Sequence, residues 1–147
     1  MADIRKLTDS LSVAPQLTAS DIALVDQMQF RSILCNRPDH EEENQPLYDE
    51  IKKQADALGI MIEFQPVNGS QINDEDVERF YQHVQDLPAP VLAYCRSGTR
   101  CTVLWALGQA GSQDEEDILS TASAAGYSLE SLRERLAERA RQSGKNA

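Results

Sequence analysis

The residues best suited to chemistry lie in the stretch YCRSGTRC, which runs from Tyr94 to Cys101. It combines two cysteines and two arginines with a glycine and small hydroxyl residues. A cysteine beside a ring of backbone N–H groups can attack phosphorus, or a sulfur bonded to an electron-withdrawing group. We therefore take Cys95 as the candidate nucleophile. Arg100 is the candidate for gripping an anion, because its planar fork matches two oxygens.

The residues between Cys95 and Arg100 could form the anion cradle. Ser97, Gly98 and Thr99 are small enough for consecutive N–H groups to turn inward, and a following helix would add its dipole. These features predict that the pKa of the thiol lies below its usual ~8.5. Arg96 either attracts an anion at the mouth or is a solvated surface residue. The alternative is that a strand-to-helix turn merely holds a cysteine.

A strand and a helix must position this loop. The run VLAY, residues 91–94, is short and wholly apolar, which is typical of a strand in the middle of a sheet. From Arg100, apolar residues recur at helical spacing until Gly111. Cys95 then lies at the carboxyl end of a strand, where α/β sheets bind their ligands.

Strands and helices alternate along the rest of the chain. After a short apolar start at residues 11–13, strands are predicted at 31–35 and 60–67. Helices are predicted at 18–29 with Thr18 or Ser20 as N-cap, at 47–59, and at 74–87 with Asn73 as N-cap. Two more helices follow, one opened by a capping box of Ser112 and Glu115. The sequence predicts an α/β fold: a central, mostly parallel sheet flanked by helices, with a helical C-terminal third.

Composition limits the functions that we consider. The 147 residues fit one domain over 1–147, with 1–8 and 142–147 expected to be frayed. A net charge of −10 opposes binding to nucleic acid or to anionic membranes. Three cysteines and no CxxC pair predict neither a disulfide framework nor a metal site, and we expect no cofactor. The start MADIRKLTDS lacks the apolar core of a signal peptide, so we expect a cytoplasmic protein.

Three segments resemble one known family. NRPDHE, PVNGSQINDEDVERF and PVLAYCRSGTRCTVLWALGQAG are similar to the beta-lactamase-hydrolase-like phosphatase domain, a family also described as small sulfur transferases. The likeness runs from about Leu11 to Gly126. It implies a fold like that of dual-specificity phosphatases. Some members are fused to a metallo-hydrolase domain related to persulfide dioxygenases, which this sequence does not contain.

Two departures from the phosphatase pattern favour sulfur chemistry. Phosphatases of this fold have His-Cys, five residues, then Arg, whereas here Tyr94 precedes Cys95 and four residues separate it from Arg100. That shorter loop is similar to the persulfide-carrying loop of rhodaneses. Asn68 also stands where the resemblance implies an aspartate general acid, which contributes roughly a hundred- to ten-thousand-fold. We therefore predict a rhodanese-type sulfurtransferase that moves sulfane sulfur from thiosulfate or a persulfide to a thiol acceptor through a Cys95 persulfide.

Two alternatives remain open. One is a cysteine-dependent phosphatase of the dual-specificity type that acts on phosphoesters, with Asp39 as the general acid or with no acid at all. The other is a non-catalytic module that binds an anion or a persulfide, or that senses redox state through a Cys95–Cys101 disulfide. Asp39 is either that acid or a turn residue after Pro38. Arg37 either adds positive charge at the rim or pairs with the acids after it. Cys101 either bonds weakly to the thiolate, acts as a resolving thiol, or is buried and inert.

Overall fold

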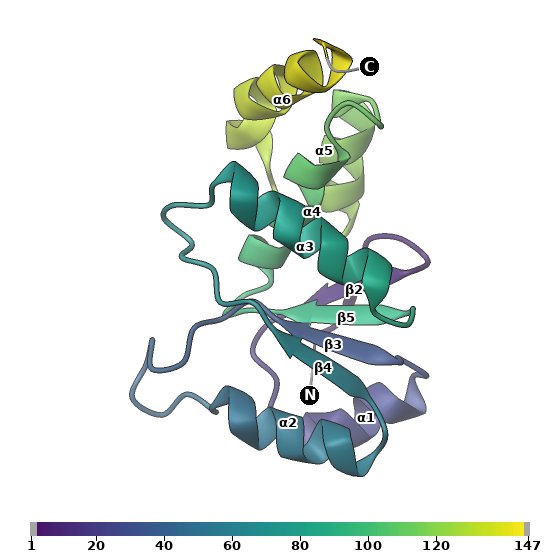
Figure 1. Ribbon diagram of the computed structural model, residues 1–147, viewed down its shortest axis with the longest axis vertical. Coiled ribbons are helices and arrows are strands. Elements are labelled where there is room, and N and C mark those ends of the chain that lie inside the picture. The colour runs from purple at the N-terminus through teal and green to yellow at the C-terminus, as the bar shows by residue number, and fades with distance from the viewer. Residues whose placement is uncertain (1–2, 146–147) are drawn as a thin grey trace.

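The computed structural model describes residues 3–145 as a twisted sheet covered by helices on both faces (Figure 1). The elements in chain order are β1 (Arg5–Lys6), β2 (Leu11–Ala14), α1 (Asp21–Gln27), β3 (Ser32–Cys35), α2 (Tyr48–Ala57), β4 (Met61–Phe64), α3 (Asp74–Asp86), β5 (Val91–Tyr94), α4 (Thr99–Gln109), α5 (Glu115–Ala124), the short 3₁₀ helix η1 (Glu130–Leu132) and α6 (Arg133–Lys145). This arrangement confirms the predicted α/β class and the helical C-terminal third.

β5 occupies the centre of the sheet, as its apolar sequence predicts. The strand order is β1-β2-β5-β3-β4, and all neighbours are parallel except β1, which runs antiparallel to β2 at one edge. Parallel strands end at the same edge of a sheet. The segments that follow β3, β4 and β5 therefore leave together, at the left of Figure 1.

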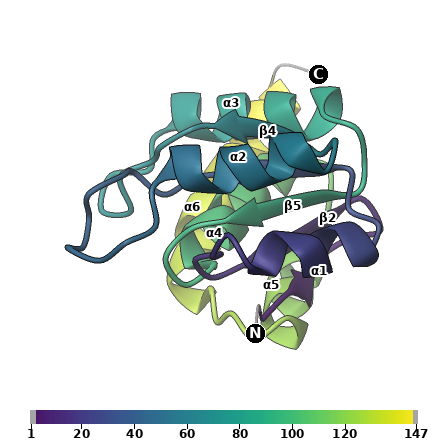
Figure 2. The ribbon, with the colours of Figure 1, turned by 90° about the horizontal axis from the view of Figure 1, so that it is seen from below.

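The two faces of the sheet carry separate apolar cores. Helices α1 and α2 cover one face, in front of the sheet in Figure 2. Helices α3 and α4 cover the other face, and α5 and α6 pack beyond α4 (Figure 1). Side chains alternate along β5, so Leu92 and Tyr94 enter the core under α1 and α2, and Val91 and Ala93 enter the opposite core. By the same alternation Cys95 belongs to the α3–α6 side.

Several local predictions were correct and others were wrong. Asn73 caps α3 through a complete capping box with Asp76. The predicted box of Ser112 and Glu115 is wrong: Asp114 is the N-cap of α5, and the Ser112 hydroxyl donates to the Gln109 carbonyl instead. Met28 falls within the helix predicted at 18–29, but it lies beyond the end of α1 and is exposed.

The chain ends differ in part from the expected fraying. Residues 5 and 6 form β1, and 142–145 continue α6; residues 1–2 and 146–147 lie outside the described part. Among residues 3–145, no helix is long and apolar enough to cross a membrane. The cytoplasmic location stays a prediction.

Candidate active site

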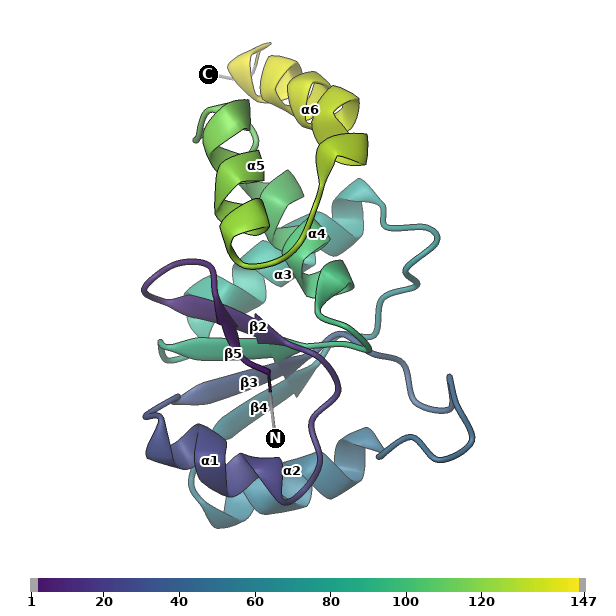
Figure 3. The ribbon, with the colours of Figure 1, turned by 180° about the vertical axis from the view of Figure 1, so that it is seen from behind.

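Three loops meet at the carboxyl edge of the sheet. We call residues 95–100, after β5, the Cys95 loop, and residues 36–47, after β3, the acidic loop; residues 65–73 follow β4. Figure 3 shows the three leaving the sheet on one side. The strand register brings them level, since Tyr94 lies opposite both Ala14 and Cys35. The next backbone contacts continue it: the Asn36 N–H donates to the Tyr94 carbonyl at 2.9 Å.

The Cys95 loop wraps its backbone around the sulfur. The Gly98 N–H donates to Cys95 Sγ at 3.1 Å, and Cys95 is fully buried. Gly98 is the N-cap of α4 with a φ of 92°, a left-handed conformation that favours glycine. The loop therefore turns back on itself and ends directly in the helix, so the N-terminal dipole of α4 lies next to the sulfur.

The pKa of the Cys95 thiol is lowered to about 6. The largest cause is a hydrogen bond from the Cys101 side chain, opposed by burial and supported by the backbone N–H groups of Cys101, Gly98 and Arg100. Burial raises the pKa of Cys101 itself well above its usual value, so that thiol keeps its proton and acts as a donor. Cys101 is thus completely buried and also a hydrogen-bond donor to the thiolate, so two of the alternatives for it apply together.

A tyrosine that the sequence analysis missed closes over this loop. The Tyr127 hydroxyl donates to the Ser97 carbonyl at 3.1 Å. A Cβ atom added at Gly98 would lie 2.1 Å from the Tyr127 hydroxyl oxygen, closer than atoms can approach. Gly98 is thus required both by its backbone angle and by this contact. No nearby motif signals Tyr127, because it lies 30 residues from Ser97 in the chain.

The Arg100 guanidinium faces a carboxylate of the acidic loop. Its two terminal nitrogens donate to the two Glu41 oxygens, each at 2.8 Å, and Nη1 also donates to the Val67 carbonyl at 3.1 Å. Arg100 and then Arg37 hold the pKa of the Glu41 carboxyl below its ordinary value. Such a bidentate pair is the arrangement that Arg also makes with phosphate. The Glu41 carboxylate therefore occupies the guanidinium face that an oxyanion would use.

The other arginines bind the same loop. Arg37 is buried and donates to Glu41 and Glu42, each at 2.9 Å, and to the Gln16 side chain at 2.9 Å. Arg37 thus pairs with the acids that follow it, which was one of the two alternatives for this residue. Arg96 is exposed and pairs with Glu42 at 2.9 Å. Three arginines and two glutamates form a single network across the mouth of the Cys95 loop.

Asp39, the candidate general acid, and Asn68, which stands at the expected position of the acid, both accept local hydrogen bonds. Asp39 Oδ1 accepts the Tyr48 N–H at 2.9 Å, at the start of α2, so Asp39 acts in the backbone structure of the acidic loop. Asn68 Oδ1 accepts the N–H and the hydroxyl of Ser70 at 3.0 and 2.9 Å. The structure therefore brings Cys95, Arg96 and Arg100 together and leaves Asp39 in a structural role.

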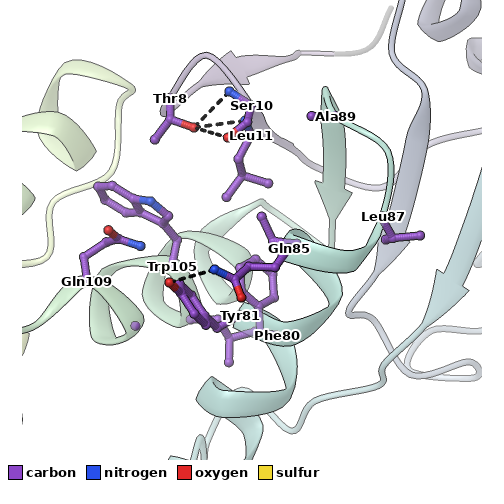
Figure 4. A pocket seen from close by; sticks show the side chains of 13 residues that line it. Thr8, Ser10, Leu11, Phe80, Tyr81, Gln85, Leu87, Ala89, Trp105 and Gln109 are labelled. Atoms are coloured by element: carbon purple, nitrogen blue, oxygen red, sulfur yellow. Dashed lines mark hydrogen bonds between the residues drawn. The ribbon is translucent and has the colours of Figure 1, made fainter. Parts of the chain in front are cut away.

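A cavity of about 500 Å³ lies elsewhere, between α3 and α4 (Figure 4). Its wall includes Phe80, Tyr81 and Trp105, with the hydroxyls of Thr8 and Ser10 opposite. No residue of the Cys95 loop lines it. It does not belong to the candidate active site.

The strand order, the helices on both faces and the cysteine loop after the central strand define a phosphatase-like fold. The chain matches the model of the family described as beta-lactamase hydrolase-like protein, phosphatase-like domain, over residues 3–112, and it belongs to that family. It is 33% identical over 126 residues to the beta-lactamase hydrolase-like protein of Agrobacterium fabrum, and 30% identical over 125 residues to that of Xylella fastidiosa. Each match covers 84% of this chain and 29% of the relative's length.

Solved structures with the same phosphatase-like fold are also similar to this chain. A crystal structure from Neisseria meningitidis Z2491, described as a "putative phosphatase", is 42% identical with a TM-score of 0.87, covering 93% of this chain and 98% of that one. A structure from Shewanella putrefaciens CN-32 with the same description shares 16% identity, a TM-score of 0.72 and coverage of 95% and 92%. The PP-IP phosphatase SIW14 of S. cerevisiae shares 16%, a TM-score of 0.69 and coverage of 98% and 92%. These last two show the fold alone.

These similarities overturn the predicted sulfurtransferase. The structure that shares 42% identity with this chain is described as a "putative phosphatase", and the family to which the chain belongs is described as a phosphatase-like domain. The prediction gave too much weight to the four-residue spacing, which fixes only the size of the loop. Because α4 begins at Thr99, Arg100 still lies in the first helical turn beside the sulfur. The predicted thiosulfate or persulfide donors and thiol acceptors are wrong together with the rhodanese assignment. The redox sensor with a Cys95–Cys101 disulfide stays a prediction.

Proposed function

We propose that this chain is a cysteine-dependent phosphatase in which Cys95 is the nucleophile and Arg100 binds the phosphoryl oxygens. One observation carries the proposal: Cys95 Sγ has a depressed pKa and accepts the Gly98 N–H at the N-terminus of α4. The same backbone groups can hold the oxygens of a phosphoryl group in front of the sulfur. The phosphatase description of the Neisseria meningitidis structure supports the same chemistry.

The reaction has two steps. The Cys95 thiolate attacks phosphorus, an S–P bond forms, and the P–O bond to the leaving group breaks with its electron pair on oxygen. Water then attacks the phosphocysteine, the S–P bond breaks, and sulfur leaves as the thiolate. The product is inorganic phosphate, and the remaining proton of the water goes to phosphate or to solvent. Thiolate is the resting form above about pH 6, because the pKa of Cys95 is about 6.

Substrate must displace the Glu41 carboxylate to reach this site. Cys95 is fully buried, and Arg100 gives both terminal nitrogens to Glu41. A phosphoryl dianion offers the guanidinium a pair of oxygens in the same geometry and carries more charge. The exchange needs Glu41 to move away with the acidic loop while Arg100 keeps its bond to the Val67 carbonyl.

A phosphate-release assay with p-nitrophenyl phosphate tests the proposal. The native chain should turn over, and Cys95→Ser should lose at least about ten-thousand-fold, the size of effect expected when a nucleophile is removed. Rapid quenching followed by intact mass measurement should show one phosphoryl group on the native chain and none on the variant. Cys35→Ser is the matched control: it replaces a buried thiol of β3 and keeps a donor for the Arg37 carbonyl. Turnover that survives Cys95→Ser would reject the assignment.

We also propose that residues 1–147 act as one domain. The two apolar cores share the strands of a single sheet, so neither face could fold by itself. The chain spans about 29% of the length of its curated relatives, and the activity of those longer proteins is not transferred to it.

A further inference from the structure

We infer that this phosphatase acts on phosphoryl groups whose leaving group departs as a stable anion, as in phosphoanhydrides and acyl phosphates, and not on phosphoserine, phosphothreonine or other alkyl phosphates. The inference rests on the proposed phosphatase function and concerns the first chemical step. In that step the leaving oxygen receives the electron pair of the broken P–O bond. An alkoxide needs a proton at that moment, whereas a phosphate or carboxylate anion does not.

The segment after β4 lies where it could protonate a leaving group. The Val67 carbonyl accepts from Arg100 Nη1 at 3.1 Å, and a Cβ atom added at Gly69 would lie 3.2 Å from Arg100 Cδ. Residue 68 stands between these two contacts, so it borders the guanidinium that would hold the phosphoryl group. The residue there is Asn68, whose amide carries no proton that it can give up at neutral pH.

The carboxylates near Arg100 are tied up as acceptors. Glu41 accepts from Arg100 and Arg37, which keep its pKa low and the carboxyl ionised. When substrate displaces Glu41 from Arg100, Arg37 in the same loop still pairs with it, so the carboxyl stays ionised and has no proton to donate. Asp39 accepts the Tyr48 N–H and contributes to the start of α2. Neither group is free to move a proton onto a leaving oxygen.

Two other side chains could donate a proton in principle. His40 is exposed on the acidic loop with a φ of 66°, and no hydrogen bond fixes its ring toward the Cys95 loop among the described contacts of residues 3–145. The Tyr127 hydroxyl already donates to the Ser97 carbonyl. His40 is therefore the stronger rival to this inference, and the experiment includes it.

The size of the selectivity follows from the missing proton. General acid catalysis contributes roughly a hundred- to ten-thousand-fold for leaving groups that need it. The phenol of tyrosine has a pKa of about 10, and the hydroxyl of serine is far less acidic than that. A phosphate monoester has its second pKa near 6, and a carboxylic acid has a pKa near 4. The site should therefore discriminate between these classes by about that factor.

The test measures kcat/KM for a series of aryl phosphates, from dinitrophenyl through p-nitrophenyl to phenyl phosphate, together with acetyl phosphate and a phosphoserine peptide. We expect kcat/KM to fall steeply as the phenol becomes less acidic, acetyl phosphate to be turned over, and the phosphoserine peptide to be at least about a hundredfold slower. Asn68→Asp keeps the size of the side chain and its acceptor for Ser70 while adding an acid. It should raise turnover of phenyl phosphate about ten- to a hundredfold and leave dinitrophenyl phosphate almost unchanged.

The possible outcomes separate the two proposals. A flat dependence on leaving group in the native chain would overturn the inference while leaving the phosphatase function intact. The same holds if His40→Ala turns a shallow dependence into a steep one, because His40 would then be the acid. Absence of turnover for every substrate, including dinitrophenyl phosphate, would instead overturn the proposed function and with it this inference.

Discussion

The Cys95 loop and the acidic loop meet at one edge of the sheet, but they are held in different ways. Apart from the contact with Tyr127, the Cys95 loop is shaped by its own neighbours: the Gly98 N–H donates to Cys95 Sγ, three residues away. The acidic loop is held by distant partners, because Glu41 binds Arg100 across 59 residues of sequence. One loop is defined locally, and the other exists in this form only once the sheet has assembled.

This difference divides the work of the site. The Cys95 loop and the first turn of α4 supply the proposed nucleophile and the donors that lower its pKa, first the Cys101 side chain and then the N–H groups of Cys101, Gly98 and Arg100. The acidic loop supplies the negative charge that pairs with Arg100. If this division is correct, substitutions in the Cys95 loop lower kcat. Substitutions in the acidic loop instead change how readily substrate reaches Arg100 and how tightly phosphate binds.

The largest effect expected within the site, after removal of the nucleophile, comes from Arg100→Ala. Loss of a preorganised group that stabilises transition-state charge typically lowers kcat by about a hundred- to a thousandfold. Arg96→Ala is the matched control in the same loop, because Arg96 is exposed and pairs only with Glu42 among the described residues. It should change kcat/KM no more than a few-fold. If both variants lose the same factor in kcat/KM for p-nitrophenyl phosphate, the two arginines do not have the different roles proposed here.

Gly98→Ala should come next, since it attacks the backbone of the Cys95 loop. The new Cβ would meet the Tyr127 hydroxyl at 2.1 Å, and the φ of 92° is strained for alanine. Displacing the loop by about an ångström can lower activity about a hundredfold. Gly59→Ala separates the causes, because Gly59 also has a positive φ, 74°, but nothing lies within 4 Å of the new Cβ.

Urea denaturation and activity should be measured on both glycine variants. Backbone strain alone costs about 1–2 kcal/mol, so Gly59→Ala should lose about that much stability and keep its activity. Gly98→Ala should lose more stability and most of its activity. If the two variants behave alike, the contact between Gly98 and Tyr127 does not shape the loop.

The contrast between the loops also explains what the sequence could predict. The apolar run of β5, the position of Cys95 at its tip and the Asn73 cap depend on residues within a few positions of each other, and each appears in the structure. The same local signals indicated a thiol with a lowered pKa. They could not show that the Cys101 side chain makes the largest contribution, because that depends on the turn of α4 around the sulfur.

The errors have a common physical origin. Ser112 and Asp114 are both good capping residues, and the choice between them depends on how α4 ends, where Ser112 bonds to Gln109. The pairing of Glu41 with Arg100 was not predicted, because the two residues lie 59 positions apart in sequence. The spacing of the Cys95 loop suggested sulfur chemistry because loop size was considered without the surrounding sheet.

A smaller effect is expected from Cys101→Ala, which removes the side-chain donor to the thiolate. The pKa of Cys95 should rise from about 6, because a bond that favours the charged form is lost. A rise of one unit lowers the thiolate fraction about tenfold below the pKa. Alkylation by iodoacetamide as a function of pH measures this directly: the rate should climb with pH through a higher midpoint than in the native chain.

Cys101→Ser is the informative control for this experiment. A serine hydroxyl can still donate to the sulfur, so the midpoint should stay closer to that of the native chain. The order native, serine, alanine supports the side-chain bond as the main cause. Equal shifts in both variants would point instead to packing in the first turn of α4.

The smallest change, Glu41→Gln, addresses the acidic loop. Glutamine keeps the shape of the side chain and an acceptor for Arg37 but removes the charge that competes for Arg100. A partly exposed ion pair contributes about 0.2–1 kcal/mol, which corresponds to at most about fivefold in affinity. Inhibition by inorganic phosphate should therefore tighten by up to that factor and depend less on salt, while Glu42→Gln should change it less because Glu42 does not contact Arg100. Weaker phosphate binding in Glu41→Gln would mean that Glu41 orients Arg100 for substrate, and the acidic loop would then belong to the chemical machinery.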